Sequence, residues 1–321
     1  MEAHKPLDLK DIQAARARIA NAAIRTPLVR LNLDQAPAEI YLKLENLQPI
    51  NSFKIRGASN AIALADPSQL ANGIYTSSAG NMAQGVAWNA RRLGLPCKVV
   101  VPDNAPETKL AAITRLGAEL IKVPYSEWWQ VMIDHRYPPL DGWLYIHPAS
   151  DPAVMAGNGT IGLEILEDLP DVEGVIIPFG SGGLSAGIAS AVRAMRPETR
   201  LYACEVETGA PLAASLAAHA PTAINYTPSF VDGIGARTVL VEMFPILSAV
   251  LDGSIVVTLA EIAAALKLLA ERNRIVAEGA GAAPVAAALT GRAGSGKVVC
   301  VVSGGNINSE RLAKIMLGEV P

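Results

Sequence analysis

The sequence predicts an α/β fold in which mostly parallel strands form sheets that helices cover on both faces. The first observation is a series of short apolar runs, several rich in β-branched residues, such as "CKVVVP", "GVIIP" and "KVVCVVS". The second is that alanine-rich segments of helical periodicity, such as "MAQGVAWNARRLG", separate these runs. The third is that three of the runs end in glycine-rich turns that open a helix. Near-continuous apolar strands that alternate with helices are typical of a parallel sheet buried on both sides.

The predicted elements follow one another from the N-terminus. In "AEIYLKLEN", Ile40, Leu42 and Leu44 share one face, which is the periodicity of a strand. A helix is predicted after Ser52, a candidate N-cap, because apolar residues follow at helical spacing as far as Ala65. Later strands are predicted at "GIYTS", "CKVVVP", "AELIKVP", "GVIIP", "RLYACEV" and "KVVCVVS". The stretch "SEWWQVMIDHRYPPLDGW" breaks this alternation, and we expect it to be a polar, aromatic loop.

Length, charge and cysteine content exclude several classes of protein. The chain has 321 residues and is 50% apolar, which suffices for one large or two smaller α/β domains. A net charge of -3 gives no electrostatic reason to expect nucleic acid, and no apolar run approaches the ~18 residues of a membrane span. The N-terminus lacks the order of a secretory signal, and three scattered cysteines argue against a disulfide framework or a zinc site. We therefore expect a cytoplasmic protein.

The glycine-rich turns "YTSSAGN", "IIPFGSGGLSAG" and "VVSGGN" predict one shared ligand site, since ligands collect beyond the carboxyl ends of parallel strands. In the second turn, Gly180, Gly182 and Gly183 let backbone N–H groups face an anion at a helix N-terminus, which favours phosphate binding. The spacing Gly180-x-Gly182-x-x-Ser185 also nearly matches the dinucleotide fingerprint, with Glu205 about 20 positions later. A nicotinamide-dependent oxidoreductase therefore stays open as an alternative from another class of enzyme.

Lys54, in "NSFKIRGA", stands at the predicted start of a helix. A helix N-terminus disfavours a cation, so this lysine breaks a local rule, and such breaks often mark function. A partly desolvated lysine favours its neutral form, which is the form that attacks a carbonyl to make a Schiff base. The alternative is an ordinary surface lysine.

The motifs "SFKIRGA", "SSAGN", "GSGGL", "AEGAGA" and "SGGN" together resemble those of the fold type II pyridoxal-phosphate enzymes. The order and spacing are similar to the serine/threonine dehydratase and serine racemase group, from about Arg25 to the C-terminus. The resemblance implies the fold of the tryptophan synthase β chain, with two open, twisted, mostly parallel sheets flanked by helices. It also implies a large cofactor-binding domain, residues 1–71 and 151–321, and a small inserted domain, residues 72–150.

The resemblance also implies a role for each matching residue. Lys54 would carry pyridoxal 5'-phosphate as a Schiff base and would then act as the base at the substrate α-carbon. The other expected cofactor contacts are Phe53 beside the ring, Asn81 at the ring 3′ oxygen, Ser303 at the ring nitrogen, Glu278 nearby, and the backbone of Gly180, Ser181, Gly182, Gly183 and Leu184 around the phosphate. The expected substrate loop comprises Ser78, Ala79, Gly80, Asn81 and Met82.

The implied reaction is removal of water from a β-hydroxy amino acid of the L-threonine or L-serine type, giving a 2-oxo acid and ammonia. A hydroxyl partner at the ring nitrogen suits this elimination, because it holds the ring less firmly protonated than a carboxylate does. Alternatives on the same cofactor are a serine racemase and a hydroxyaspartate or phenylserine dehydratase. The group implies a homodimer that acts on a small amino acid, without nucleic acid or membrane, and we expect no C-terminal regulatory domain.

Three positions depart from the group's pattern. Ala79 replaces the serine that serves racemases as the second acid/base, so we expect dehydration with little racemisation, because two-sided proton transfer needs a group on each face. Met82 replaces a histidine common in dehydratases, so a less polar substrate such as phenylserine becomes credible. Glu205 is a candidate ligand for an activating divalent metal, but Pro211 stands where a second carboxylate belongs, and we expect no metal.

Overall fold

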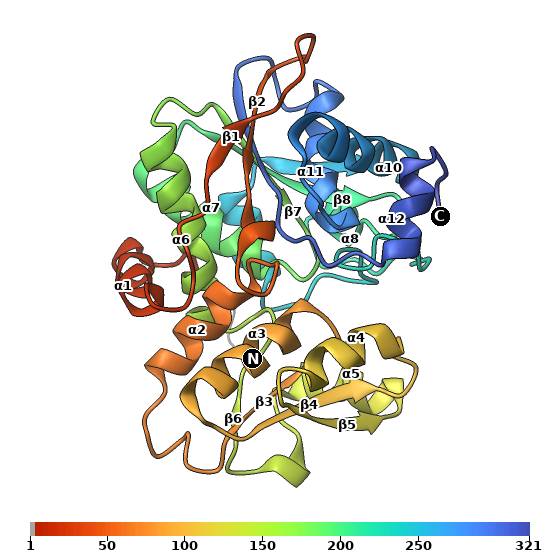
Figure 1. Ribbon diagram of the computed structural model, residues 1–321. Helices are drawn as coiled ribbons and strands as arrows, with labels where there is room; N and C mark the ends of the chain where they lie inside the picture. Colours follow the sequence, from red (N-terminus) through yellow and green to blue (C-terminus); the bar gives the residue numbers. More distant parts are fainter. Residues whose placement is uncertain (1–3) are drawn as a thin grey trace.

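The computed structural model describes residues 4–321 and confirms the predicted fold class. Two sheets, both mostly or entirely parallel, are flanked by helices and lie in two lobes (Figure 1). None of the helices in residues 4–321 is both long and apolar enough to cross a membrane. The three cysteines are buried and unpaired, as the sequence indicated.

The larger sheet has six strands in the order β1-β2-β10-β7-β8-β9. Only the β1–β2 pair is antiparallel. The strands are β1 (Leu28–Arg30), β2 (Glu39–Lys43), β7 (Gly174–Pro178), β8 (Arg200–Val206), β9 (Gly253–Val257) and β10 (Lys297–Val301). The helices and turns of this lobe are α1 (Leu9–Ile19), η1 (Glu45–Leu47), α2 (Lys54–Leu64), α6 (Pro152–Asp168), α7 (Gly183–Met195), α8 (Pro211–Ala218), α9 (Phe244–Val250), α10 (Leu259–Leu268), η3 (Leu269–Asn273), α11 (Gly279–Leu289) and α12 (Ser309–Met316).

The strands of the larger sheet bury alternate side chains in two cores, one on each face. In β10, Val298 and Cys300 join the core under α10 and α11, whereas Val299 and Val301 join the core under α6, α7 and α9. Figure 1 shows α6 and α7 on one side of this sheet and α10 and α11 on the other. Burial on both faces explains why the central strands β7 and β10 are almost continuously apolar in the sequence.

The smaller sheet has four parallel strands in the order β5-β4-β3-β6. They are β3 (Ile74–Ser77), β4 (Cys97–Pro102), β5 (Glu119–Val123) and β6 (Leu144–Tyr145), accompanied by α3 (Asn81–Leu93), α4 (Glu107–Thr114), α5 (Tyr125–Asp134) and η2 (Pro138–Leu140). All four strands fall within residues 72–150, the range predicted as the inserted domain. The exact boundaries of that domain stay a prediction.

Two local predictions were wrong. The stretch expected to be an aromatic loop contains helix α5, the turn η2 and the approach to β6. The sequence carries a helical signal there, since Tyr125, Trp128 and Met132 recur at helical spacing, but the polar residues between them obscured it. The N-cap of α2 is Phe53 and not Ser52, whose hydroxyl oxygen accepts the backbone N–H of Lys54 at 3.4 Å.

Helix α2 joins the two lobes and packs closely on α6, which in turn packs on α7. Glycine permits the approach, since a Cβ on Gly157 of α6 would lie 2.5 Å from the carbonyl oxygen of Arg56. A Cβ on Gly187 of α7 would likewise collide with the carbonyl oxygen of Met155. The beginning of α2 is therefore held against the larger lobe through direct backbone contact.

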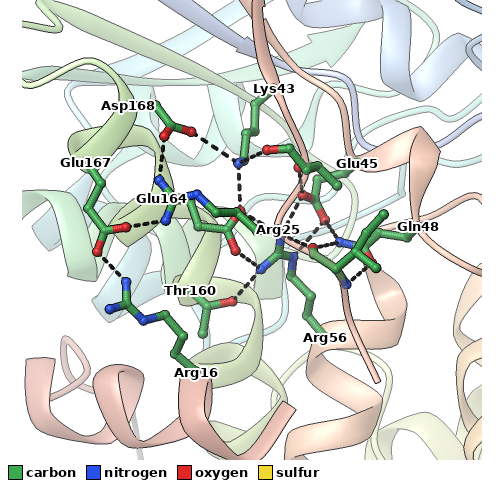
Figure 2. A network of polar contacts seen from close by, with 12 residues as sticks. Arg16, Arg25, Lys43, Glu45, Gln48, Arg56, Thr160, Glu164, Glu167 and Asp168 are labelled. Carbon is green, nitrogen blue, oxygen red and sulfur yellow. Dashed lines mark hydrogen bonds and ion pairs between the residues drawn. The ribbon is translucent and has the colours of Figure 1, made fainter. Parts of the chain in front are cut away.

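A buried network of charges fixes the same part of α2 (Figure 2). Arg56 Nε lies 2.8 Å from Glu45 Oε2, and Arg56 Nη1 lies 2.6 Å from Glu164 Oε1. Lys43 Nζ lies 2.6 Å from Glu164 Oε2 and donates to the Thr26 carbonyl oxygen at 2.6 Å. These side chains are almost fully buried, so each charge depends on its partners. The network ties α2 to the strand β2 and to α6.

Candidate active site

A cavity of about 440 Å³ lies where the carboxyl ends of β3, β7 and β10 meet the start of α2. Every residue predicted to hold the cofactor or the substrate lines it: Phe53, Lys54, Ser78, Ala79, Gly80, Asn81, Met82, Gly180, Ser181, Gly182, Gly183, Leu184, Glu278 and Ser303. A neighbouring cavity of about 640 Å³ is larger, but it shares only Glu278 with this set. Chemistry and not size therefore identifies the candidate site.

Lys54 is the first residue of α2 and reaches into the cavity. Its Nζ donates a hydrogen bond to the carbonyl oxygen of Pro148 at 2.8 Å. Burial lowers the pKa of Lys54 to about 8, and the carboxylate of Glu278 offsets part of this effect. A substantial fraction of the amine is therefore neutral near pH 8, which is the form that acts as a nucleophile or base.

Asn81, Glu278 and Asn306 form a hydrogen-bonded chain on the wall of the cavity. Asn81 Nδ2 donates to Glu278 Oε1 at 2.9 Å, and Asn306 Nδ2 donates to Asn81 Oδ1 at 2.9 Å. Burial, followed by the nearby charge of Asp232, raises the pKa of Glu278 to about 7. Asn306 is the last residue of "SGGN", yet the sequence assigned it no role. These two hydrogen bonds fix the orientation of the Asn81 amide.

The turn between β7 and α7 forms a cradle that fits a phosphate group. Gly182 has a φ of 94°, a conformation that favours glycine. A Cβ on Gly183 would lie 2.5 Å from the Ala149 carbonyl oxygen, so the chain there admits no side chain. The first N–H groups of α7 have no partner within the helix, and its positive end favours an anion. The geometry fits the phosphate of the expected cofactor.

His147 and Pro148 lie just after β6, and of the two only Pro148 lines the cavity. The Nδ1 atom of His147 accepts the backbone N–H groups of Ala149 and Ser150 at 3.1 and 2.8 Å, and its Nε2 lies 3.2 Å from the Met132 carbonyl oxygen. Burial, followed by the neighbouring His135, lowers the pKa of His147 to about 3, so the ring is neutral. This ring shapes the turn that presents the Pro148 carbonyl to the amine of Lys54.

Glu205 does not line the cavity, and its carboxylate serves the fold. Its Oε1 accepts the N–H of Leu212 and its Oε2 accepts the N–H of Ala213, both at 2.8 Å, at the first turn of α8. The hydroxyl of Ser254 donates to Oε2 at 2.6 Å. Across residues 4–321, no three His, Cys, Asp or Glu side chains gather where they could hold a metal ion. The structure therefore assigns Glu205 to helix capping.

Residues 19–304 match the sequence model of the family described as pyridoxal-phosphate dependent enzymes. The chain belongs to this family. The family match and the curated lyase relatives leave the nicotinamide alternative without support. The resemblance noted from the five sequence motifs is confirmed.

Curated relatives and solved structures agree with this assignment. The chain is 39% identical to an L-threonine ammonia-lyase of Geobacter sulfurreducens, over 95% of this chain and 77% of that protein. It is 36% identical to the catabolic L-threonine dehydratase TdcB of Escherichia coli K12, over 97% of this chain and 96% of that protein. The structure of maize serine racemase superposes with a TM-score of 0.88 and 31% identity, over 98% of each chain.

Proposed function

We propose that this enzyme is a lyase that removes water from a β-hydroxy amino acid of the L-threonine or L-serine type, releasing a 2-oxo acid and ammonia. The single observation that carries the proposal is the partly desolvated amine of Lys54 in the same cavity as the phosphate cradle. The relatives named L-threonine ammonia-lyase and dehydratase, at 36% to 39% identity over nearly the whole chain, support this choice of reaction.

Bound pyridoxal phosphate supplies an aldehyde for amines and an electron-withdrawing ring that acidifies the substrate α-carbon. Lys54 would hold that cofactor and would then take the proton from the α-carbon. Its contact with the Pro148 carbonyl keeps the amine directed into the cavity until a ligand replaces it. A pKa of about 8 for Lys54 suits proton transfer near neutral pH.

The remaining residues would bind and orient. The backbone of Gly180–Leu184 would hold the phosphate, Phe53 would pack beside the ring, and Ser303 would meet the ring nitrogen. Asn81 has two amide hydrogens, and since one goes to Glu278, the other is free for the ring 3′ oxygen. The loop from Ser78 to Met82, which opens α3, would receive the substrate carboxylate at a helix N-terminus.

Borohydride reduction of the holoenzyme, followed by peptide mass spectrometry, tests the cofactor assignment. We expect the cofactor mass on Lys54 and its loss in Lys54→Ala. Lys109→Ala is the matched control, since Lys109 also lines the cavity, and it should leave the labelled peptide unchanged. Label on any other lysine, or none, would refute the assignment. Release of 2-oxo acid and ammonia from L-threonine and L-serine then tests the reaction itself.

Three finer expectations accompany the proposal. The enzyme should work without added divalent metal, because Glu205 is committed to α8 and no second ligand stands beside it. We also propose a homodimer and a cytoplasmic location, which size-exclusion chromatography with light scattering and cell fractionation would test. Full activity that requires added Mg²⁺ after dialysis against EDTA would contradict the first expectation.

A further inference from the structure

One face of helix α5 forms an aromatic wall in the active-site cavity. Tyr125, Trp128, Trp129 and Met132 all line the cavity, and their spacing of three, four and seven residues places them on one side of the helix. The ring centroids of Tyr125 and Trp128 lie 5.5 Å apart, and those of Trp128 and Trp129 lie 6.2 Å apart. Met82, buried at the start of α3, adds a second flexible apolar side chain to the lining. We call Tyr125, Trp128, Trp129, Met132 and Met82 the aromatic wall.

The aromatic wall is attached to the residues that surround the reacting atoms. The hydroxyl of Ser77, just before the substrate loop, donates to the sulfur of Met132 at 3.1 Å. The carbonyl of Met132 lies 3.2 Å from the ring of His147, which shapes the turn that contacts Lys54. The wall is thus part of the same packed unit as the substrate loop and the catalytic lysine. A preformed apolar wall selects ligands by the area that they bury against it.

The charges in the cavity indicate which side chains the wall would accept. Among the residues that the structure describes, the charged ones lining this cavity are Lys54, Lys109, Asp232 and Glu278, with no arginine or histidine. Lys109 already pairs with Asp232 at 3.1 Å. An acidic substituent such as that of hydroxyaspartate would therefore find no free cation and would lose its hydration. An aromatic or large apolar substituent would instead meet rings and thioether sulfurs.

We infer that the aromatic wall makes this enzyme prefer a β-hydroxy amino acid whose β-carbon carries an aromatic or large apolar group, of the β-phenylserine type. The inference rests on the proposed function, because it concerns the substrate of the same elimination. Water leaves from the α- and β-carbons, and hydrolysis of the resulting imine returns one water. Phenylserine thus gives phenylpyruvate and ammonia, with no oxidant or reductant.

The first experiment compares kcat/KM of the holoenzyme for L-serine, L-threonine, L-threo-3-hydroxyaspartate and L-threo-3-phenylserine. We expect phenylserine to exceed L-threonine by about tenfold or more, because a few well-packed carbon atoms in an apolar pocket are worth that much. Hydroxyaspartate should be the poorest of the four. If L-threonine or L-serine exceeds phenylserine, the inference is wrong and the proposed function stands. If none yields a 2-oxo acid although Lys54 carries the cofactor, the proposed function itself is wrong.

Variants of the wall test whether it causes the preference. Trp129→Ala should lower the phenylserine-to-threonine ratio of kcat/KM by about tenfold. Tyr125→Ala should lower it less, and this variant should fold readily because Tyr125 is 47% exposed. Trp143→Ala is the matched control, since that tryptophan lies outside the cavity beneath Lys98, and it should leave the ratio unchanged. An unchanged ratio in both wall variants would assign the preference to other residues and overturn the inference.

Binding of unreactive analogues gives a readout that is independent of turnover. L-phenylalanine lacks the β-hydroxyl group, so it can occupy the site without losing water. Calorimetric titration of the holoenzyme should give a dissociation constant for L-phenylalanine about tenfold below that for L-alanine. Trp129→Ala should remove most of this difference, whereas Trp143→Ala should preserve it. Equal affinities in the unmodified enzyme would contradict the role given to the wall.

Discussion

Two cations near the start of α2, only two residues apart, have opposite surroundings. Arg56 does not line the cavity, and its guanidinium meets the carboxylates of Glu45 and Glu164 (Figure 2). Burial works to lower the pKa of Arg56, but these two partners outweigh burial and raise it. Lys54 lines the cavity, where its amine donates to the Pro148 carbonyl and lies 5.2 Å from the centroid of the Phe53 ring, and burial lowers its pKa. The same helix therefore holds one permanent charge and one amine that exchanges its proton.

The difference indicates that ion pairing with a carboxylate, more than burial, decides whether a basic side chain stays charged or can lose its proton. A paired guanidinium anchors the helix to β2 and α6, whereas an amine without a carboxylate partner within hydrogen-bonding distance keeps its nucleophilicity. The anchor also benefits the chemistry, because a fixed helix start fixes the backbone from which Lys54 extends. Variants of Lys54, Arg56 and Glu278 change one of these two surroundings at a time, and the other should not respond.

The largest effect is expected for Lys54→Ala, which removes the residue proposed both to attach the cofactor and to accept the substrate proton. Ammonia release should fall by about 1,000-fold or more, in keeping with the loss of a positioned acid/base group. The free energy of unfolding of the apoenzyme should stay the same or rise, because a poorly solvated amine is removed from the cavity. Activity assays and urea denaturation of the same preparation measure the two quantities. If Lys54→Ala lowered the free energy of unfolding as much as Arg56→Ala, Lys54 would be a structural residue like Arg56, and the distinction between the two would fail.

The sequence predicted the residues that line the cavity around Lys54 well, because short stretches of consecutive residues specify them. Lys54 and the glycine turns at 78–82 and 180–184 are each specified by a few consecutive residues after a strand or before a helix. Parallel topology then brings such turns to one edge of the sheets. All of these residues line one cavity, and their individual roles stay proposals.

The partners of these residues could not be predicted, because they are distant in the chain. Arg56 stood inside the motif "SFKIRGA", yet Glu164 lies 108 residues away. Asn81 and Glu278 are separated by 197 residues. The capping role of Glu205 was not predicted for a different reason, since the helix that it caps begins only a few residues later and no sequence pattern marked the cap. Single-sequence patterns reveal strands and turns but not which buried polar groups meet.

The role of Arg56 in anchoring α2 is tested by Arg56→Ala, which leaves the carboxylates of Glu45 and Glu164 buried with fewer partners. Unfolding should become easier by about 3–5 kcal/mol, the usual cost of breaking a buried ion pair by removing one member. The control is Arg16→Ala, at an exposed pair with Glu167, which should cost less than about 1 kcal/mol. Urea denaturation measures both variants. Equal, small losses would mean that the buried network contributes little to the anchoring of α2.

Lowering the pH should change the free energy of unfolding in opposite directions through Glu278, in the cavity, and through Glu45, beside Arg56. Burial, together with the charge of Asp232, raises the pKa of Glu278 in the folded apoenzyme to about 7 from 4.5. The folded state thus keeps a proton that the unfolded state releases, so this contribution is complete below about pH 4.5 and is lost as the pH rises to 7, by about 3 kcal/mol. For Glu45, burial is outweighed by Arg56, and the lowered pKa makes its contribution disappear as the pH falls.

Glu278→Gln removes the contribution of Glu278 to this pH dependence and leaves that of Glu45. The variant should lose the decline in unfolding free energy between pH 4.5 and 7, while the acid-induced loss that Glu45 causes should remain. Urea denaturation of the apoenzyme at several pH values measures both slopes. The attribution to Glu278 would be wrong if the variant retained the full decline between pH 4.5 and 7.

The smallest effect is expected for Ala79→Ser, which adds a hydroxyl to the substrate loop without disturbing either side of α2. Elimination needs one proton acceptor, which Lys54 would provide under the proposed function, whereas racemisation needs a second group on the opposite face of the substrate. The variant should therefore produce a small amount of D-serine from L-serine, and its elimination rate should change little. Chiral chromatography of the reaction mixture detects the product. If the unmodified enzyme already racemises serine as fast as it eliminates water, then another group supplies the second proton, and the unpaired lysine is only one of two reactive groups in the cavity.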